Sequence, residues 1–376
     1  MSVTSVIKER LPYRVRRALA ISKMSARSLA SRHKGYKDFV LSTISASQRM
    51  DRSFGRPVHV SIEPTNICNL RCPVCETGDG TLGRKSGHLP VEGFKHIVDT
   101  LSDHVNVLYY YFMGEPFLVK NAYDMIAYAT EKQIWVDTCT NGEFVDAKSL
   151  IDSGIGRISF QIGGMTQKTH ETYRVRGNLD AALANLEACV AEKRRRPDSR
   201  SQIKVGFIVM KHNEHEVDAF TKYAKEIGVD DYEIVYPGVR TLEQGHEYLT
   251  MNEKYWVYDK DAFDRGILKP KLQSNHYCEW LYYTTTIQVN GDVVPCCRDP
   301  RGQNVLGNVF EQDFVSDIWN GEAYRNFRRL VATNQGDTGI CSMCEGYTAP
   351  DITKHDEPLL PIAGPEPIQQ PEKIAS

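Results

Sequence analysis

The chain has 376 residues, of which 41% are hydrophobic and 25% are charged, and its formal net charge is −2. This composition excludes a wholly disordered chain, and the lack of an uncharged apolar run of about eighteen residues predicts no membrane-spanning helix. The charge is uneven, because residues 1–57 carry 13 Lys and Arg against 3 Asp and Glu.

Residues 1–55 are predicted to form a basic arm of one or two helices. The arm either packs on the main domain or contacts anionic lipid or a partner protein. No nucleic-acid recognition motif accompanies it, so no nucleic-acid partner is expected. Arg14, Arg16 and Arg17 interrupt any apolar segment of a secretion signal. We therefore expect a cytoplasmic protein, with peripheral membrane contact through the arm as one interpretation.

Residues 56–265 are predicted to form an α/β domain, because short apolar segments alternate with helical ones. Helices are expected over Val91–Leu101, Leu179–Lys193 and Glu214–Ile227. Six such βα units imply parallel strands with crossover helices, and they fall short of the eight of a closed barrel. We predict an open, partial (β/α)6 barrel, whose strands are Val58–Ile62, Val105–Tyr111, Ile134–Cys139, Arg157–Ile162, Ile203–Met210 and Asp231–Val235.

Residues 266–348 are predicted to form a small second unit, a β-hairpin followed by helices. Strands Thr284–Val289 and Val293–Pro295 flank Asn290-Gly291, a dipeptide that supplies the positive φ of a tight turn. Helical stretches follow near Phe314–Trp319 and Glu322–Val331. Residues 349–376 hold six of the 17 prolines, which is typical of an extended, disordered tail.

Ten cysteines are many for a reducing compartment, where they more often serve metals or catalysis than disulfides. Cys68, Cys72 and Cys75 form C-x3-C-x2-C directly after the first predicted strand. Three thiolates on one loop can hold three irons of a [4Fe–4S] cluster and leave the fourth open to a ligand. A zinc site and a chance spacing are the alternatives.

This motif resembles the signature of the radical S-adenosylmethionine (SAM) enzymes, and further segments match that family in order. Gly114-Glu115-Pro116 follows the second strand, where the family binds the methionyl amino group, and Thr140-Asn141-Gly142 follows the third. The family often places ribose and carboxylate contacts where this chain has Ser159, Gln161 and, downstream, Arg174. The resemblance implies that Gly114, Glu115, Pro116, Asn141, Ser159, Gln161 and Arg174 bind SAM. One departure is Val74, because the family usually has an aromatic residue just before the third cysteine.

Cys278, Cys296, Cys341 and Cys344 form a second set, and four ligands fit either a fully ligated [4Fe–4S] cluster or a zinc knuckle. Next to a radical SAM domain, the set resembles the SPASM/twitch extension that carries auxiliary clusters. No cysteine follows Cys344, so the shorter twitch version with one auxiliary [4Fe–4S] cluster is the better match. The spacing is similar to that of 2-deoxy-scyllo-inosamine dehydrogenase-type enzymes. Cys297 is interpreted as a packing residue or a substitute for Cys296.

The resemblance implies an enzyme in which a 5′-deoxyadenosyl radical abstracts hydrogen from a small polar substrate. Oxidation or epimerisation of a sugar or aminocyclitol is the first hypothesis, and epimerisation needs a thiol donor, for which Cys139 and Cys297 are candidates. A peptide-modifying maturase is the alternative, and a non-enzymatic iron–sulfur or zinc protein is the second. A flavodoxin- or ferredoxin-type electron donor is implied. Cys189, with apolar neighbours in a helix, is interpreted as a core residue.

Overall fold

The computed structural model describes residues 22, 23, 26, 34–272 and 276–344. Its centre is one nine-stranded sheet in the order β6-β5-β4-β3-β2-β1-β7-β8-β9. The expectations for most of the basic arm and for the proline-rich tail lie outside the described residues. The strands are β1 (His59–Ile62), β2 (Val107–Tyr109), β3 (Trp135–Thr140), β4 (Arg157–Ile162), β5 (Gln202–Ile208), β6 (Asp231–Val235), β7 (Thr284–Ile287), β8 (Asp292–Val294) and β9 (Gly307–Asn308).

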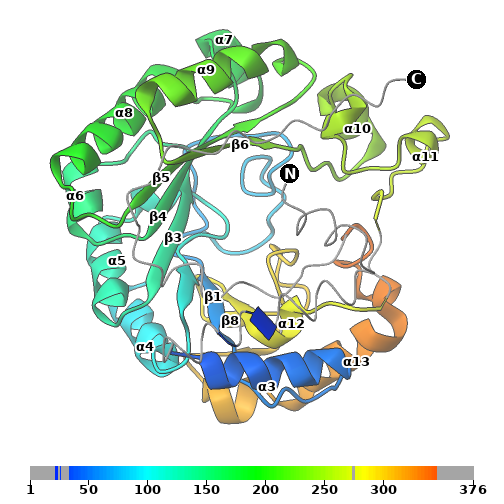
Figure 1. Cartoon of the computed structure of the whole chain (residues 1–376). Helices are drawn as coiled ribbons and strands as arrows, with labels where there is room; N and C mark the ends of the chain where they lie inside the picture. Colours follow the sequence, from blue (N-terminus) through cyan, green and yellow to red (C-terminus); the bar gives the residue numbers. More distant parts are fainter. Residues whose placement is uncertain (1–21, 24–25, 27–33, 273–275, 345–376) are drawn as a thin grey trace.

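Strands β1 to β6 pair in parallel, and the helices between them form an arc around the outside of the curved sheet (Figure 1). This confirms the α/β class and the partial barrel. Most outward side chains of β1 to β5 are apolar, and Val60, Leu108, Val136, Phe160 and Val205 are each at most 1% exposed, so burial against the helices stabilises the curvature. The helices of this arc are α4 (Val91–Leu101), η1 (Pro116–Leu118), α5 (Ala122–Glu131), α6 (Ala147–Asp152), α7 (Gln167–Tyr173), α8 (Leu179–Arg195), η2 (Glu214–Glu216) and α9 (Val217–Ile227).

The predicted C-terminal hairpin is present, because β7 and β8 pair antiparallel on either side of Gly291, whose φ is +88°. The sequence does not predict the second strand with which the hairpin pairs. Strand β7 also pairs in parallel with β1, so the hairpin continues the barrel sheet. The helical elements around it are α12 (Trp280–Tyr283), η4 (Phe314–Ile318), α13 (Glu322–Asn334) and η5 (Gln335–Thr338).

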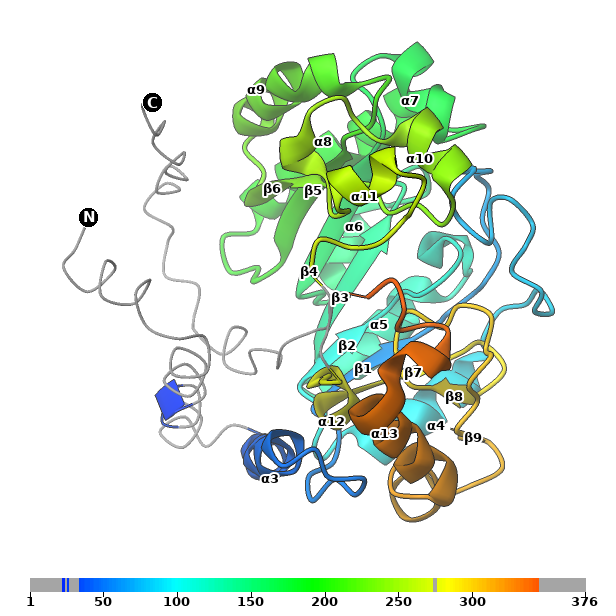
Figure 2. The same ribbon diagram turned by 90° about the vertical axis from the view of Figure 1, so that its right-hand side faces the viewer.

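The segment after β6 packs over the first cysteine loop, and sequence reasoning missed this contact. It contains α10 (Leu242–Tyr248), η3 (Glu253–Tyr255) and α11 (Lys260–Asp264), which come after the edge strand β6 in the chain. Helices α10 and α11 lie in the half of the molecule that holds β5 and β6 (Figure 2). Its aromatic side chains Trp256, Tyr258 and Phe263 share a hydrophobic cluster with Leu70 and Val74 of the loop. The cysteine loop is thereby shielded from water on that side.

Arg328 of α13 joins the C-terminal elements to the chain that enters β1. Its side chain is buried, and its guanidinium carbon lies 4.4 and 4.3 Å from the ring centroids of Trp319 and Tyr324. The guanidinium donates hydrogen bonds to the carbonyls of Leu281, Trp319 and Asp51. Burial lowers its pKa to about 10, so the group still carries its charge near pH 7.

Helix α3 (Tyr36–Ser47) packs against α12 and is the part of the basic arm that the structure describes as regular helix. This helix therefore agrees with the interpretation in which the arm packs on the folded part of the chain, while most of residues 1–33 lie outside the described residues. Among the described residues, no helix is long and apolar enough to cross a membrane.

We predict that Arg328→Met lowers the free energy of unfolding by about 2–4 kcal/mol, because three carbonyls, two of them in buried hydrogen bonds, lose a charged donor. Urea unfolding followed by circular dichroism measures the change. Arg329→Met is the matched control, since Arg329 pairs with Asp51 at the surface, where an ion pair contributes at most about 1 kcal/mol. Equal effects of the two substitutions would contradict a structural role for the buried guanidinium.

Candidate active site

Cys68, Cys72 and Cys75 lie on the loop that leaves the C-terminal end of β1. Burial, with smaller contributions from Glu115 and from the thiols Cys72 and Cys75, raises the pKa of Cys68 to about 12, so the three sulfurs lie within reach of one another's charge. The amide N–H of Leu70 points at Cys68 Sγ over 3.4 Å, and the Arg174 guanidinium lies 3.9 Å from Cys72 Sγ. Three grouped thiols with nearby donors fit an iron–sulfur cluster, whose ligands are thiolates.

Gly114 and Glu115 bring the end of β2 onto the same loop. Gly114 has φ +80°, and a Cβ there would lie 2.5 Å from the carbonyl oxygen of Thr65, so only glycine fits. The amide of Glu115 donates to the carbonyl of Ile67 (2.9 Å). Pro116, the next residue, opens η1 and is buried. The motif after β2 is therefore held directly against the residues that precede Cys68.

The Glu115 carboxylate is buried and ties β2 to the end of β3. It accepts hydrogen bonds from Thr140 Oγ1 (2.7 Å) and from the amide of Asn141 (2.8 Å). Burial raises its pKa to about 7, although the bond from Asn141 opposes this shift. The carboxylate thus positions Asn141 at the carboxyl edge of the sheet.

A polar network that sequence reasoning missed links Asn141 back to the cysteine loop. Asn141 Nδ2 donates to Asn69 Oδ1 (2.8 Å), and Asn69 Nδ2 donates to Glu143 Oε2 (3.0 Å). Glu143 also accepts from the amide of Asn178 (3.0 Å). Asn69 directly follows the first cysteine of the motif, and this adjacency is the signal by which it could have been found.

The inner face of β3 to β6 carries polar side chains in register. Cys139 stands opposite Ser159, and Gln161 stands opposite Gly206. Gln161 Nε2 donates to Ser159 Oγ (2.8 Å), and the Gln161 amide lies so close to Gly206 that a Cβ there would be 2.5 Å from it. The structure thus brings Cys139, Ser159 and Gln161 together on one wall of the barrel interior.

Two ion pairs lie on the same inner face and were not predicted. Arg157 pairs with Asp137, its direct neighbour across β3 and β4. Lys204 Nζ lies 2.7 Å from Glu233 and 3.3 Å from Asp231 on the edge strand β6. Because these charges point into the barrel, the interior is able to bind polar groups.

Aromatic side chains and a second thiol complete this interior. The rings of Tyr109 and Trp280 stack with centroids 6.5 Å apart, and His59 Nδ1 lies 3.2 Å from the Tyr109 hydroxyl. Burial raises the pKa of Tyr109 to about 12, and Asp137 and Cys297 contribute to the shift. Cys297 is exposed and also raises the pKa of Tyr111, so its thiol faces this aromatic wall.

The second cysteine set also converges. Burial raises the pKa of Cys278 to about 12, with contributions from Cys344 and Cys341. Burial and Cys297 raise the pKa of Cys296, with smaller contributions from Cys278 and Cys341. Four thiols within reach of one another's charge, with the Arg298 amide pointing at Cys296 Sγ (3.4 Å), suit a cluster with protein ligands on every iron. In the described part of the chain, no three His, Cys, Asp or Glu converge closely enough for a single metal ion.

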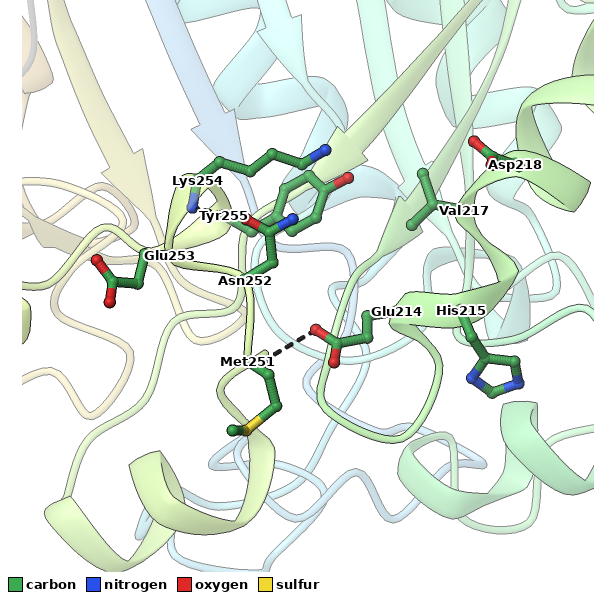
Figure 3. A pocket seen from close by; sticks show the side chains of 9 residues that line it. All are labelled: Glu214, His215, Val217, Asp218, Met251, Asn252, Glu253, Lys254 and Tyr255. Carbon is green, nitrogen blue, oxygen red and sulfur yellow. Dashed lines mark hydrogen bonds between the residues drawn. The ribbon is translucent and has the colours of Figure 1, made fainter. Parts of the chain in front are cut away.

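Cys189 of α8 is fully buried in the main hydrophobic core, which confirms its interpretation as a core residue. Away from both cysteine sets, an open hollow of about 750 Å³ lies between the start of α9 and residues 251–255 (Figure 3). Glu214 crosses it to accept a hydrogen bond from the amide of Met251. No cysteine or barrel-interior residue lines this hollow, so it adds nothing to the candidate chemistry.

Comparison with known proteins agrees with this geometry. Residues 62–224 match the model of the radical SAM superfamily, and residues 278–345 match SPASM, an iron–sulfur cluster-binding domain. The chain is a radical SAM enzyme with a C-terminal SPASM domain. It therefore uses a [4Fe–4S] cluster with SAM, together with an auxiliary iron–sulfur cluster.

Relatives of this radical SAM enzyme differ in what they act on. The mycofactocin maturase MftC of Mycobacterium tuberculosis is 22% identical over 344 residues, which cover 85% of this chain and 84% of the relative. The SAM-dependent 2-deoxy-scyllo-inosamine dehydrogenase of Niallia circulans is 20% identical, and the match covers 82% of this chain and 99% of that relative. The structure of Streptococcus suis SuiB bound to precursor peptide SuiA shares the fold, with a TM-score of 0.55, 16% identity, and coverage of 78% and 72%.

We predict about eight irons per chain, with matching sulfide, after anaerobic reconstitution, since each cubane holds four. Cys68→Ala and Cys296→Ala should each reduce the count to about four, because each removes a ligand of a different cluster. Cys189→Ala is the control and should leave the count unchanged. Four irons in the unsubstituted protein, accompanied by one zinc, would contradict an auxiliary cubane.

Proposed function

We propose that this radical SAM enzyme acts on a small hydroxylated substrate, a sugar or an aminocyclitol, which it oxidises or epimerises. The observation that carries the proposal is the barrel interior, where ion pairs and aromatic rings share the inner face of the sheet. Carboxylate and guanidinium groups pair with vicinal hydroxyls, and aromatic faces cover the apolar face of a sugar ring. An interior built for a long apolar side chain would not require these charges.

The cofactors would be held by residues at the carboxyl edge of the sheet. Cys68, Cys72 and Cys75 would bind the first cluster, and SAM would lie against Gly114, Glu115, Pro116, Asn141, Ser159, Gln161 and Arg174. With SAM bound, this site would provide the radical chemistry that removes a hydrogen atom from the substrate. Cys278, Cys296, Cys341 and Cys344 would bind one auxiliary [4Fe–4S] cluster. An electron donor of flavodoxin or ferredoxin type would supply the reducing electron.

The protein's own task is to orient the substrate beneath this site. The Asp137–Arg157 pair offers an acceptor and donors side by side, and the Tyr109–Trp280 stack offers a flat apolar surface. The carbon to be attacked would then face Cys139 and Ser159 at the centre of the wall. The Tyr109–Trp280 stack would shield a bound substrate from water on one side, which would protect a reactive intermediate.

Oxidation and epimerisation differ in the fate of the substrate radical. Oxidation removes a further electron and a proton, whereas epimerisation returns a hydrogen atom from the opposite face. Burial raises the pKa of Cys139 to about 12, so Cys139 remains a protonated thiol near neutral pH and retains a hydrogen to donate. Cys297, near Tyr111, is the second thiol on this interior. We place oxidation first, in line with a single auxiliary cluster.

Peptide modification is the second candidate, and some of the relatives support it, among them the mycofactocin maturase MftC. The fold is shared with SuiB, whose structure is described with a precursor peptide. Strand β6 is the edge strand of the sheet, and Tyr236 just after it is 48% exposed, which supports this edge as the entry for a peptide. A peptide would have to enter there to reach Cys139.

The reaction is tested by incubating reduced, reconstituted enzyme with SAM and candidate sugars, aminocyclitols and peptides, followed by mass spectrometry. We expect a cyclitol or sugar product that is two hydrogens lighter. Incorporation of one deuterium from heavy water, without a mass change in light water, would instead identify epimerisation. In that case Cys139→Ala and Cys297→Ala identify the donor, because only the donor variant loses deuterium incorporation. A modified peptide with unchanged sugars would overturn the proposal.

The binding role of the interior charges is tested by Arg157→Met. Loss of the guanidinium removes hydrogen bonds to the substrate, and we expect KM for the accepted sugar to rise at least about tenfold, which corresponds to about 1.4 kcal/mol of binding. Cleavage of SAM without substrate should be unchanged. Arg196→Met, which breaks a surface pair with Asp152, is the control. An unchanged KM in Arg157→Met would remove this residue from the substrate site.

A further inference from the structure

A buried ion pair lies between the two cysteine sets. Glu63, directly after β1, is 0% exposed, and the Arg84 side chain is 10% exposed. The two groups pair through both carboxylate oxygens, with Arg84 Nη2 at 2.6 Å from Oε1 and Nη1 at 2.7 Å from Oε2. This is the bidentate geometry that only arginine can supply.

Each partner of this pair also holds the C-terminal hairpin region. Glu63 Oε2 accepts a hydrogen bond from the amide of Val289, two residues after β7 (2.9 Å). Arg84 Nε donates to the carbonyl of Pro300, in the loop that follows Cys296 (2.6 Å). Arg84 itself belongs to the loop that follows Cys75. One ion pair therefore contacts the loop of the first cysteine set and the loop of the second.

The loop that begins at Cys296 is ordered by its own contacts. Asp299 accepts hydrogen bonds from the amides of Gln303 and Asn304, and Gln288 donates to the Asp299 carbonyl. A second tie between the loops, from Arg301 to Thr81 Oγ1 (3.2 Å), is solvent-exposed and hence weak. The bond from Arg84 to Pro300 is shorter (2.6 Å) and partly buried, so it is the stronger of these two ties.

We propose that Arg84 is a positioning residue that fixes the Cys296 loop against the Cys68–Cys75 loop. It thereby sets the position of the auxiliary iron–sulfur site relative to the first one. The inference rests on Cys296 as an auxiliary ligand and does not depend on the substrate. It has an electronic consequence, because the Arg298 amide that points at Cys296 Sγ belongs to the same loop. Hydrogen bonds to ligand sulfurs and solvent access both tune the reduction potential of a cluster.

Two variants separate positioning from folding. Arg84→Lys keeps a positive charge beside Glu63 but cannot bond both carboxylate oxygens and Pro300 through one planar group. The double variant Glu63→Gln with Arg84→Met removes both charges, so no unpaired charge remains buried. Arg301→Met, which removes the exposed tie between the same loops, is the matched control.

The reconstituted full-length protein is examined without substrate. Hydrogen–deuterium exchange should be about tenfold faster over residues 288–302 in the double variant and unchanged over residues 157–162 of β4. A redox titration followed by electron paramagnetic resonance measures the reduction of the auxiliary cluster. In the double variant its equilibrium constant for reduction should change about tenfold, which is a shift of about 59 mV for one electron. The cluster at Cys68–Cys75 should keep its potential, Arg84→Lys should show a smaller effect, and Arg301→Met none.

The proposal is overturned if the Arg84 variants match the unsubstituted protein in both measurements. It is equally overturned if exchange rises over residues 157–162 as much as over 288–302 while the auxiliary potential stays constant, because the pair would then serve only overall stability. Iron counts on each variant show that both sites are loaded before the comparison is made.

Discussion

Strand β1 pairs in parallel with β2 on one side and with β7 on the other, and both cysteine sets depend on this arrangement. The first cysteine loop leaves the carboxyl end of β1. The hairpin that leads to Cys296 begins with β7, the neighbour of β1 in the sheet. A strand with hydrogen-bonded partners on both sides has no free edge and is fixed in register. The two sites are therefore held by one set of backbone hydrogen bonds.

Two buried carboxylates stand at the ends of neighbouring strands, and their different partners give them different roles. Glu63 is matched by Arg84, so its charge is balanced by a full opposite charge. Glu115 has only neutral donors as direct partners, which is why burial raises its pKa to about 7. Glu63 therefore suits a permanent tie between segments. Glu115 is sensitive to a charged ligand, since a cation bound nearby would favour its ionised form.

Local patterns in the sequence predicted the elements that depend on neighbouring residues. The βα alternation, the strand Arg157–Ile162, the helix Val91–Leu101 and the Asn290-Gly291 turn are all present. Long-range pairings were not predictable, because a hairpin sequence does not specify which strand it joins. The pairing of β7 with β1 and the contacts Asp137–Arg157 and Glu63–Arg84 arise only once the sheet order is known.

The surroundings of Val74 show how a departure from a family motif is accommodated. The family's aromatic residue is absent at this position, but Val74 shares its hydrophobic cluster with Tyr173, Trp256 and Tyr258. These rings come from α7 and from the segment after β6, which sequence reasoning left without a role. Because the Tyr258 hydroxyl is bonded to both the amide and the carbonyl of Val239, its ring is fixed in orientation. Aromatic surface beside the cysteine loop is thus provided by tertiary packing, so the motif position itself is free to hold a smaller side chain.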